Sequence, residues 1–131
     1  MERIYNKDCD EKMLSPLLLA FVGDAVFDLM VRERLVCEFN APVGVLNDMK
    51  IKEVCCRSQS KRIKSILSGL TEKELTIFKR GRNAHTSNTP KNASVEEYHN
   101  ATGLEALFGY IYLTGDIRRL RELFTLVIRD L

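Results

Sequence analysis

Two apolar stretches of the sequence each contain acidic side chains with no basic residue to balance them. Across residues 17–31 the only charged residues are Asp24 and Asp28, and across residues 101–114 the only one is Glu105. A helix that is apolar on every side is expected at the centre of a domain. An ionised carboxylate there is costly unless it is paired or binds a metal, so Asp24 and Glu105 are the candidates for chemistry. Asp28 lies one turn from Asp24 on the same face and could support such a site, although we expect it to be solvent-exposed.

Glycine residues flank both acids. Gly23 precedes Asp24, and Gly103 and Gly109 lie near Glu105. Because glycine inside a helix costs about 0.5–1 kcal/mol relative to alanine, we expect these glycines to mark a close crossing of two helices. Such a crossing would bring the two carboxylates together, and a hard divalent cation such as Mg²⁺ would relieve their repulsion. The alternative is that either acid pairs with an arginine or lies at an exposed helix edge.

A basic segment precedes the second acidic stretch. Residues 79–93 contain four lysine or arginine residues and no acid, with neutral hydrogen-bonding residues among them. Contacts to phosphates and ribose hydroxyls dominate the recognition of double-stranded RNA, so we predict an RNA-binding segment here. Its candidate residues are Lys79, Arg80, Arg82, Asn83, His85, Lys91 and Asn92. Residues 50–64 also carry several lysine and arginine side chains. They could extend the RNA-binding segment into one positive stripe, but for this predicted helix we favour a solvated surface.

The elements that must position these residues all read as helices. Ser15 followed by Pro16 predicts a helix start, and the apolar pattern continues toward Leu35. Further helices are predicted over residues 45–67, from a capping box at 71–74 through Phe78, and from a second capping box at 94–97 to residue 114. Asp116 is expected to cap a last amphipathic helix, and residues 81–93 are expected to form a loop. No strand pattern is visible, so we predict an all-α fold in a single domain spanning residues 1–131.

The composition is globular and argues against several other functions. Hydrophobic residues make up 45% and charged residues 29% of the chain, and the net charge is only +2,. Sparse aromatics and the absence of tryptophan disfavour a single-strand binder built on base stacking,. The cysteines lack zinc-ligand spacing and no export or membrane segment is visible, so we expect reduced thiols in a cytoplasmic protein. These cysteines are Cys9, Cys37, Cys55 and Cys56.

Three segments together resemble the ribonuclease III catalytic-domain family. Residues 19–26 (LAFVGDAV) are similar to the family's signature helix, whose core ends on a metal-binding aspartate. Residues 102–109 (TGLEALFG) resemble its second acidic motif, and residues 79–84 (KRGRNA) the basic stretch ahead of it. The resemblance covers essentially the whole chain. It implies the ribonuclease III endonuclease-domain helical fold in a homodimer, with Asp24 and Glu105 as metal ligands and catalytic acids.

Two positions depart from the family pattern. Typical members have a glutamate where Ala20 stands and an aspartate where Thr102 stands, which leaves fewer protein ligands for metal. Water and the scissile phosphate would then fill more of the coordination shell, as magnesium tolerates. The small size and the lack of a following double-stranded-RNA-binding domain resemble the compact Mini-ribonuclease III branch of the family.

The resemblance implies a metal-dependent endoribonuclease that cleaves double-stranded RNA and leaves 5′ phosphates. It further implies Mg²⁺, with Mn²⁺ as a substitute, and a cytoplasmic homodimer that matures the ends of the 23S ribosomal RNA precursor. A ribosomal protein or a ribosomal precursor particle would be a further partner. The alternative is a catalytically weak or inactive RNA-binding module associated with ribosome assembly, which the altered positions 20 and 102 would suit. A helical interaction protein that touches no RNA would leave the basic segment unexplained.

Overall fold

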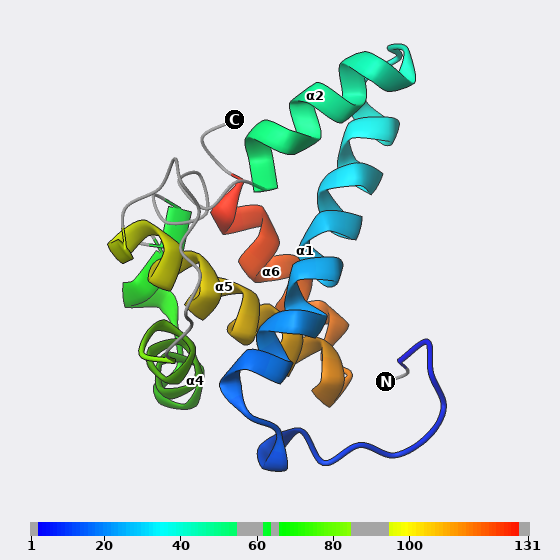
Figure 1. Ribbon diagram of the computed structural model, residues 1–131. Coiled ribbons are helices and arrows are strands. Elements are labelled where there is room, and N and C mark those ends of the chain that lie inside the picture. The colour runs from blue at the N-terminus through cyan, green and yellow to red at the C-terminus, as the bar shows by residue number, and fades with distance from the viewer. Residues whose placement is uncertain (1–2, 55–61, 64–65, 85–94, 129–131) are drawn as a thin grey trace.

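The structure is a computed structural model that describes residues 3–54, 62–63, 66–84 and 95–128, and its regular elements there are all helical (Figure 1). This confirms the all-α prediction. None of the described helices is long and apolar enough to cross a bilayer. The elements are a 3₁₀ turn at Glu11–Met13, α1 (Pro16–Glu38), α2 (Val43–Val54), a 3₁₀ turn at Leu67–Gly69, α4 (Glu72–Arg82), α5 (Val95–Thr114) and α6 (Ile117–Val127).

Side-chain caps begin three of these helices where the sequence predicts them. The Ser15 hydroxyl accepts a hydrogen bond from a backbone N–H in the first turn of α1. Thr71 and Glu74 form a reciprocal capping box at the start of α4, and Asp116 caps α6. Each cap satisfies backbone donors that the first turn of a helix leaves unpaired. The predicted starts of α1, α4 and α6 are therefore confirmed.

The predicted loop at residues 81–93 begins too early. α4 continues to Arg82, and Gly81 is a buried helical residue. A Cβ atom at Gly81 would lie 2.7 Å from the Cβ of Ala106 and 2.9 Å from the Cα of Gly103. This glycine therefore serves the packing of α4 on α5, which the pattern within one segment does not reveal. Most of the loop, residues 85–94, lies outside the described residues.

The predicted helix over residues 45–67 is only partly described. α2 begins at Val43, and its described part ends at Val54. Leu67 belongs to the second 3₁₀ turn instead of to a continuing helix. Residues 55–61 and 64–65, which include Cys55 and Cys56, lie outside the described residues.

α5 lies at the centre of the fold, as its apolar composition predicts. It packs against both α1 and α4, and 11 of its 20 residues are buried. Aromatic rings join the helices around it, because the Phe27 ring meets those of Phe108 and Phe124 edge to face at 5.3 and 5.7 Å. These contacts fix α1, α5 and α6 relative to one another.

The prediction that α1 is also buried on every side is wrong for this chain. One face of α1 is buried against the core. Its other face is exposed at five large apolar positions, which are Leu17, Leu18, Phe21, Leu29 and Val36. In Figure 1 the C-terminal half of α1 extends beyond the body of the protein together with α2, which has no buried residue. α1 is thus a helix with two apolar faces, of which the single chain covers only one.

Candidate active site

Two glycines allow α1 and α5 to touch backbone to backbone. A Cβ atom at Gly23 would lie 1.6 Å from the carbonyl oxygen of Glu105 and 2.7 Å from the amide nitrogen of Gly109. A Cβ atom at Gly109 would lie 1.9 Å from the carbonyl oxygen of Leu19. Neither position accepts a side chain unless a helix moves. Gly103, in contrast, lies against Phe78 of α4, so it serves a different helix contact from the one predicted.

This crossing brings the carboxyl groups of Asp24 and Glu105 into hydrogen-bonding contact. Asp24 is exposed and Glu105 is half-buried. Burial, together with the negative charge of Asp24 and the hydrogen bond to it, raises the pKa of Glu105 to about 8,. Near neutral pH, Glu105 therefore retains its proton when no cation is bound. A divalent cation is the other species that such a pair of oxygen ligands can hold.

The pair is a two-acid site within the described part of the chain. No group of three or more His, Cys, Asp or Glu residues suited to a metal occurs there. Ala20 and Thr102 are both buried, and the Thr102 hydroxyl donates to the backbone carbonyl of Tyr98 at 3.0 Å. The side chains at these two positions therefore add no acidic ligand. Two carboxylates suit magnesium, which retains several water ligands when it binds to a protein.

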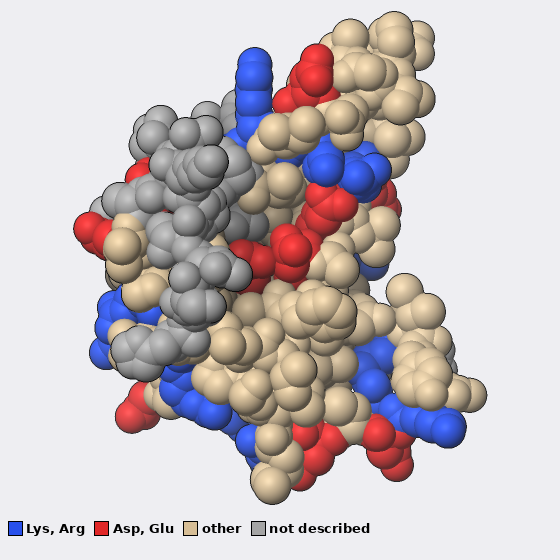
Figure 2. All heavy atoms as spheres, in the orientation of Figure 1, with Lys and Arg blue, Asp and Glu red and all other residues tan. Residues whose placement is uncertain are grey.

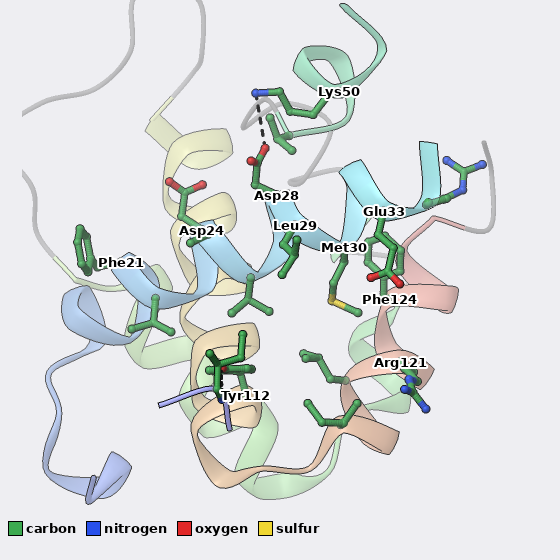
Figure 3. A pocket seen from close by; sticks show the side chains of 18 residues that line it. Phe21, Asp24, Asp28, Leu29, Met30, Glu33, Lys50, Tyr112, Arg121 and Phe124 are labelled. Atoms are coloured by element: carbon green, nitrogen blue, oxygen red, sulfur yellow. Dashed lines mark hydrogen bonds and ion pairs between the residues drawn. The ribbon is translucent and has the colours of Figure 1, made fainter. Parts of the chain in front are cut away.

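Asp28 is neither a third acid of this site nor freely solvated. Its Oδ2 accepts a hydrogen bond from the Arg32 Nε at 2.8 Å, and the Lys50 Nζ lies 3.6 Å from its Oδ1. Its side chain is only 29% exposed, which corrects the expectation of a solvent-exposed role. In Figure 3, Asp24 and Asp28 extend from the same side of α1, and Lys50 reaches Asp28 from α2. Two cations thus offset the charge of this carboxylate.

A groove of about 1190 Å³ borders Asp24 and runs along the exposed side of α1 (Figure 3). Its walls are largely apolar, and α6 supplies part of the side opposite α1. Charged residues at its edges include Asp28, Glu33, Lys50 and Arg121. Sequence reasoning missed this groove because it assigned every apolar residue of α1 to the core. The signal that could have revealed it is that Phe21 and Leu29 do not share the face of the buried residues Phe27 and Val31.

Those predicted RNA-binding residues that the structure describes lie in the last turn of α4 and directly after it. Lys79, Arg80 and Asn83 are exposed. Arg82 lies over the ring of Phe78, with 5.8 Å between its guanidinium carbon and the ring centroid, and its Nε donates to Asn83 Oδ1 at 3.3 Å. Figure 2 shows lysine and arginine atoms over the region of α4, while acidic atoms lie in the hollow below α2.

The packing of Gly81 holds this basic turn against the same part of α5 that carries Glu105. A Cβ atom at Gly81 would lie 3.2 Å from the Thr102 carbonyl oxygen as well as near Gly103 and Ala106. The remaining predicted RNA-binding residues, His85, Lys91 and Asn92, lie outside the described residues.

Comparisons with known proteins agree on one family. Residues 17–116 match the Ribonuclease III domain. The chain is 43% identical over 116 residues to a Mini-ribonuclease 3 of Thermoanaerobacter sp., which covers 88% of this chain and 82% of that protein. It is 39% identical over 120 residues to a Mini-ribonuclease 3 of Clostridium tetani, with coverage of 91% and 80%. A crystal structure of a Fusobacterium nucleatum protein superposes with a TM-score of 0.81 at 33% identity, over 90% of this chain and 94% of that one.

Proposed function

Because this chain belongs to the ribonuclease III domain family and is an endoribonuclease, we propose that it cleaves double-stranded RNA at a divalent-metal site formed by Asp24 and Glu105. The observation that carries this proposal is the contact between two acids from different helices at a glycine crossing. The family generally uses divalent metals and double-stranded RNA. For this chain we propose Mg²⁺, with Mn²⁺ as a substitute, because carboxylate oxygens are the ligands that these hard cations prefer.

The chemistry we propose is hydrolysis of a phosphodiester bond. A water oxygen adds to phosphorus in line with the leaving 3′ oxygen, which departs as a hydroxyl and leaves a 5′ phosphate on the other fragment. When bound, the metal would activate water and offset the charge that develops on the leaving oxygen. Asp24 and Glu105 would hold it, and Glu105 must lose its proton to do so because proton and cation compete for the same oxygens.

We also propose that the enzyme works as a homodimer joined through the exposed face of α1. Phe21 is 79% exposed and Leu29 is 55% exposed, and both line the groove. Contiguous apolar surface of this kind is uncommon on a monomer and marks a contact surface. A second copy would cover the part of this face at Phe21 and Leu29 and leave the side of the groove at Asp24 and Lys50 open to RNA, and each of the two sites would cut one strand of the duplex.

The dimer is tested by Phe21→Glu, which should shift the mass in solution from two chains to one and strongly reduce double-strand cleavage. Val43→Glu is the matched control, because Val43 is 82% exposed and lies outside the groove. It should leave the mass unchanged. A dimeric Phe21→Glu protein would exclude this face as the interface.

The cleavage proposal is tested with a short RNA duplex, with and without Mg²⁺. Asp24→Asn and Glu105→Gln should each abolish cutting while leaving duplex binding largely intact. Asp48→Asn, at an exposed acid of α2 outside the groove, is the matched control and should cut at the wild-type rate. Cutting by Asp24→Asn at the wild-type rate would show that the metal assignment is wrong.

The second candidate is a catalytically weak or inactive RNA-binding module of ribosome assembly. The observation in its favour is that Ala20 and Thr102 supply no carboxylate, so the site has two acids. The same assay separates the candidates, because this module would bind the duplex without cutting it when Mg²⁺ is present. For the natural substrate we propose the ends of the 23S ribosomal RNA precursor, within a cytoplasmic ribosomal precursor particle. This substrate rests only on the likeness to Mini-ribonuclease 3 proteins.

A further inference from the structure

Lys50 lies in the same groove as Asp24, although it comes from a different helix. Its Nζ is 3.6 Å from Asp28 Oδ1, and its side chain is only 17% exposed, which is low for a lysine,. The other partner of Asp28, Arg32, is 55% exposed and does not line the groove. Together, two cations and one carboxylate leave an excess positive charge one turn away from Asp24 on α1. Figure 3 shows Lys50 reaching toward the side of α1 from which both aspartates extend.

We propose that Lys50 is a substrate-contacting residue of this active site, and that it binds a non-bridging phosphate oxygen of the RNA strand beside the acid pair. Asp28 is the positioning residue that holds the Lys50 ammonium at this place. The inference rests on the proposed function, because it takes Asp24 and Glu105 as the point where the strand is cut.

A cation beside the acid pair favours the approach of a polyanion. A polyanion that approaches Asp24 meets a carboxylate, and the positive charge of Lys50 in the same groove opposes that repulsion. A lysine ammonium has three donors, and at 3.6 Å its contact with Asp28 is longer than a charge-assisted hydrogen bond,. Donors therefore remain for a phosphate oxygen. Because Asp28 limits where the flexible lysine can go, less side-chain entropy is lost when RNA binds.

The first experiment compares Lys50→Gln with Lys52→Gln on a short RNA duplex at saturating Mg²⁺. Lys52 is exposed on the same helix and does not line the groove, so it is a control for the loss of one positive charge. Lys50→Gln should lower kcat/KM by about tenfold to a hundredfold, the range for a hydrogen bond to a charged group. Lys50→Arg should recover most of the activity, and Lys52→Gln should change it less than about threefold. Equal losses for Lys50→Gln and Lys52→Gln would overturn the proposal.

A binding measurement separates this inference from the cleavage proposal. In the Asp24→Asn background, Lys50→Gln should make the salt dependence of duplex binding shallower by about one phosphate contact. This readout does not require cutting, so it decides the role of Lys50 even if the wild-type enzyme proves inactive. An unchanged slope would remove Lys50 from the RNA contact.

The role of Asp28 is tested by a double-mutant cycle. If Asp28 acts through Lys50, Asp28→Asn should lower kcat/KM several-fold, and the double variant Asp28→Asn/Lys50→Gln should be no worse than Lys50→Gln alone. The concentration of Mg²⁺ for half-maximal activity should stay at the wild-type value in Asp28→Asn. Additive losses would show that Asp28 does not act through Lys50. A raised requirement for Mg²⁺ would instead make Asp28 a metal ligand.

Discussion

The backbone of Gly23 lies so close to Glu105 that a Cβ atom at position 23 would come within 1.6 Å of the Glu105 carbonyl oxygen. The two helices therefore meet at the same level at which each carries its acid. Asp24 follows the contact point on α1, and Glu105 is the contact point on α5. A contact between helix backbones thus sets the positions from which the two acidic side chains extend.

Gly23→Ala should destabilise the protein by about 3 kcal/mol, because the added methyl group overlaps backbone atoms that cannot move alone. Urea unfolding measures this change. Gly44→Ala is the matched control, since nothing lies within 4 Å of a Cβ atom at Gly44 in α2. That variant should be more stable than wild type by about 0.5 kcal/mol, because alanine restricts the unfolded chain. Equal stability of the two variants would show that the helices do not cross so closely.

The crossing could be predicted from the sequence because its signals are local. Gly23 next to Asp24, and Gly109 one turn from Glu105, are visible within single apolar segments,. The structure confirms that these helices meet and that the two acids touch. Their role as metal ligands remains a proposal.

The features that sequence reasoning missed depend on contacts between elements. α4 continues through Gly81 because this glycine packs against Ala106 and Gly103 on α5. The two cations on Asp28 come from its own helix and from α2. The apolar composition of α1 does not reveal which of its faces the same chain covers. The Gly81 contact and the Lys50–Asp28 pair depend on packing between helices, which periodicity along one helix does not contain.

Without metal, the stability of the protein should fall as the pH rises through the range in which Glu105 ionises. Its pKa in the folded protein is about 8, against an ordinary value of 4.5. Between these values the folded state holds a proton that the unfolded state has lost, so the free energy of unfolding decreases with increasing pH. Thermal or urea unfolding from about pH 5 to about pH 9, with a chelator present to remove metal, measures this slope.

Glu105→Gln should remove most of that slope, because the glutamine does not ionise. At about pH 9 it should be more stable than the metal-free wild type by about 2 kcal/mol, since each pH unit is worth about 1.4 kcal/mol and solvent screening reduces the sum. At the same pH, added Mg²⁺ should increase the stability of the wild-type protein and have little effect on the stability of Glu105→Gln. Glu33→Gln removes an exposed acid from α1 and should keep the wild-type profile. A steep slope that persists in Glu105→Gln would contradict this assignment.

The buried ion pair between Glu74 and Arg119 joins the start of α4 to α6. Both carboxylate oxygens of Glu74 accept hydrogen bonds from Arg119 at 2.7 Å, and Arg119 also donates to the carbonyl of Gly69 at 2.9 Å. Burial alone would raise the pKa of Glu74, but the hydrogen bonds from Arg119 and Thr71 outweigh it and hold the pKa below its ordinary value,.

Glu74→Gln should cost about 3 kcal/mol, because it leaves a part-buried arginine without its buried charge partner. In the wild type this contribution should be complete above about pH 4.5 and disappear as the pH falls through the lowered pKa of Glu74,. Urea titrations at several pH values measure both effects. Glu122→Gln is the matched control, since Glu122 also bonds Arg119, at 3.1 Å, but is 49% exposed. Glu122→Gln should change the free energy of unfolding by less than about 1 kcal/mol. A loss equal to that of Glu74→Gln would show that the stabilisation does not come from the Glu74–Arg119 pair.

The basic turn of α4 should supply part of the affinity for duplex RNA without supplying the chemistry. Lys79 and Arg80 are exposed there, held by the packing of Gly81 on α5. The double variant Lys79→Ala/Arg80→Ala should weaken duplex binding about tenfold or more and make its salt dependence shallower by about two phosphate contacts. Its kcat at saturating RNA should remain near wild type, because neither residue lies at the acid pair. Lys12→Ala, at an exposed lysine of the N-terminal 3₁₀ turn, should leave the slope unchanged. Fluorescence anisotropy over a series of salt concentrations measures both slopes, and parallel slopes for wild type and the double variant would take this turn out of the RNA interface.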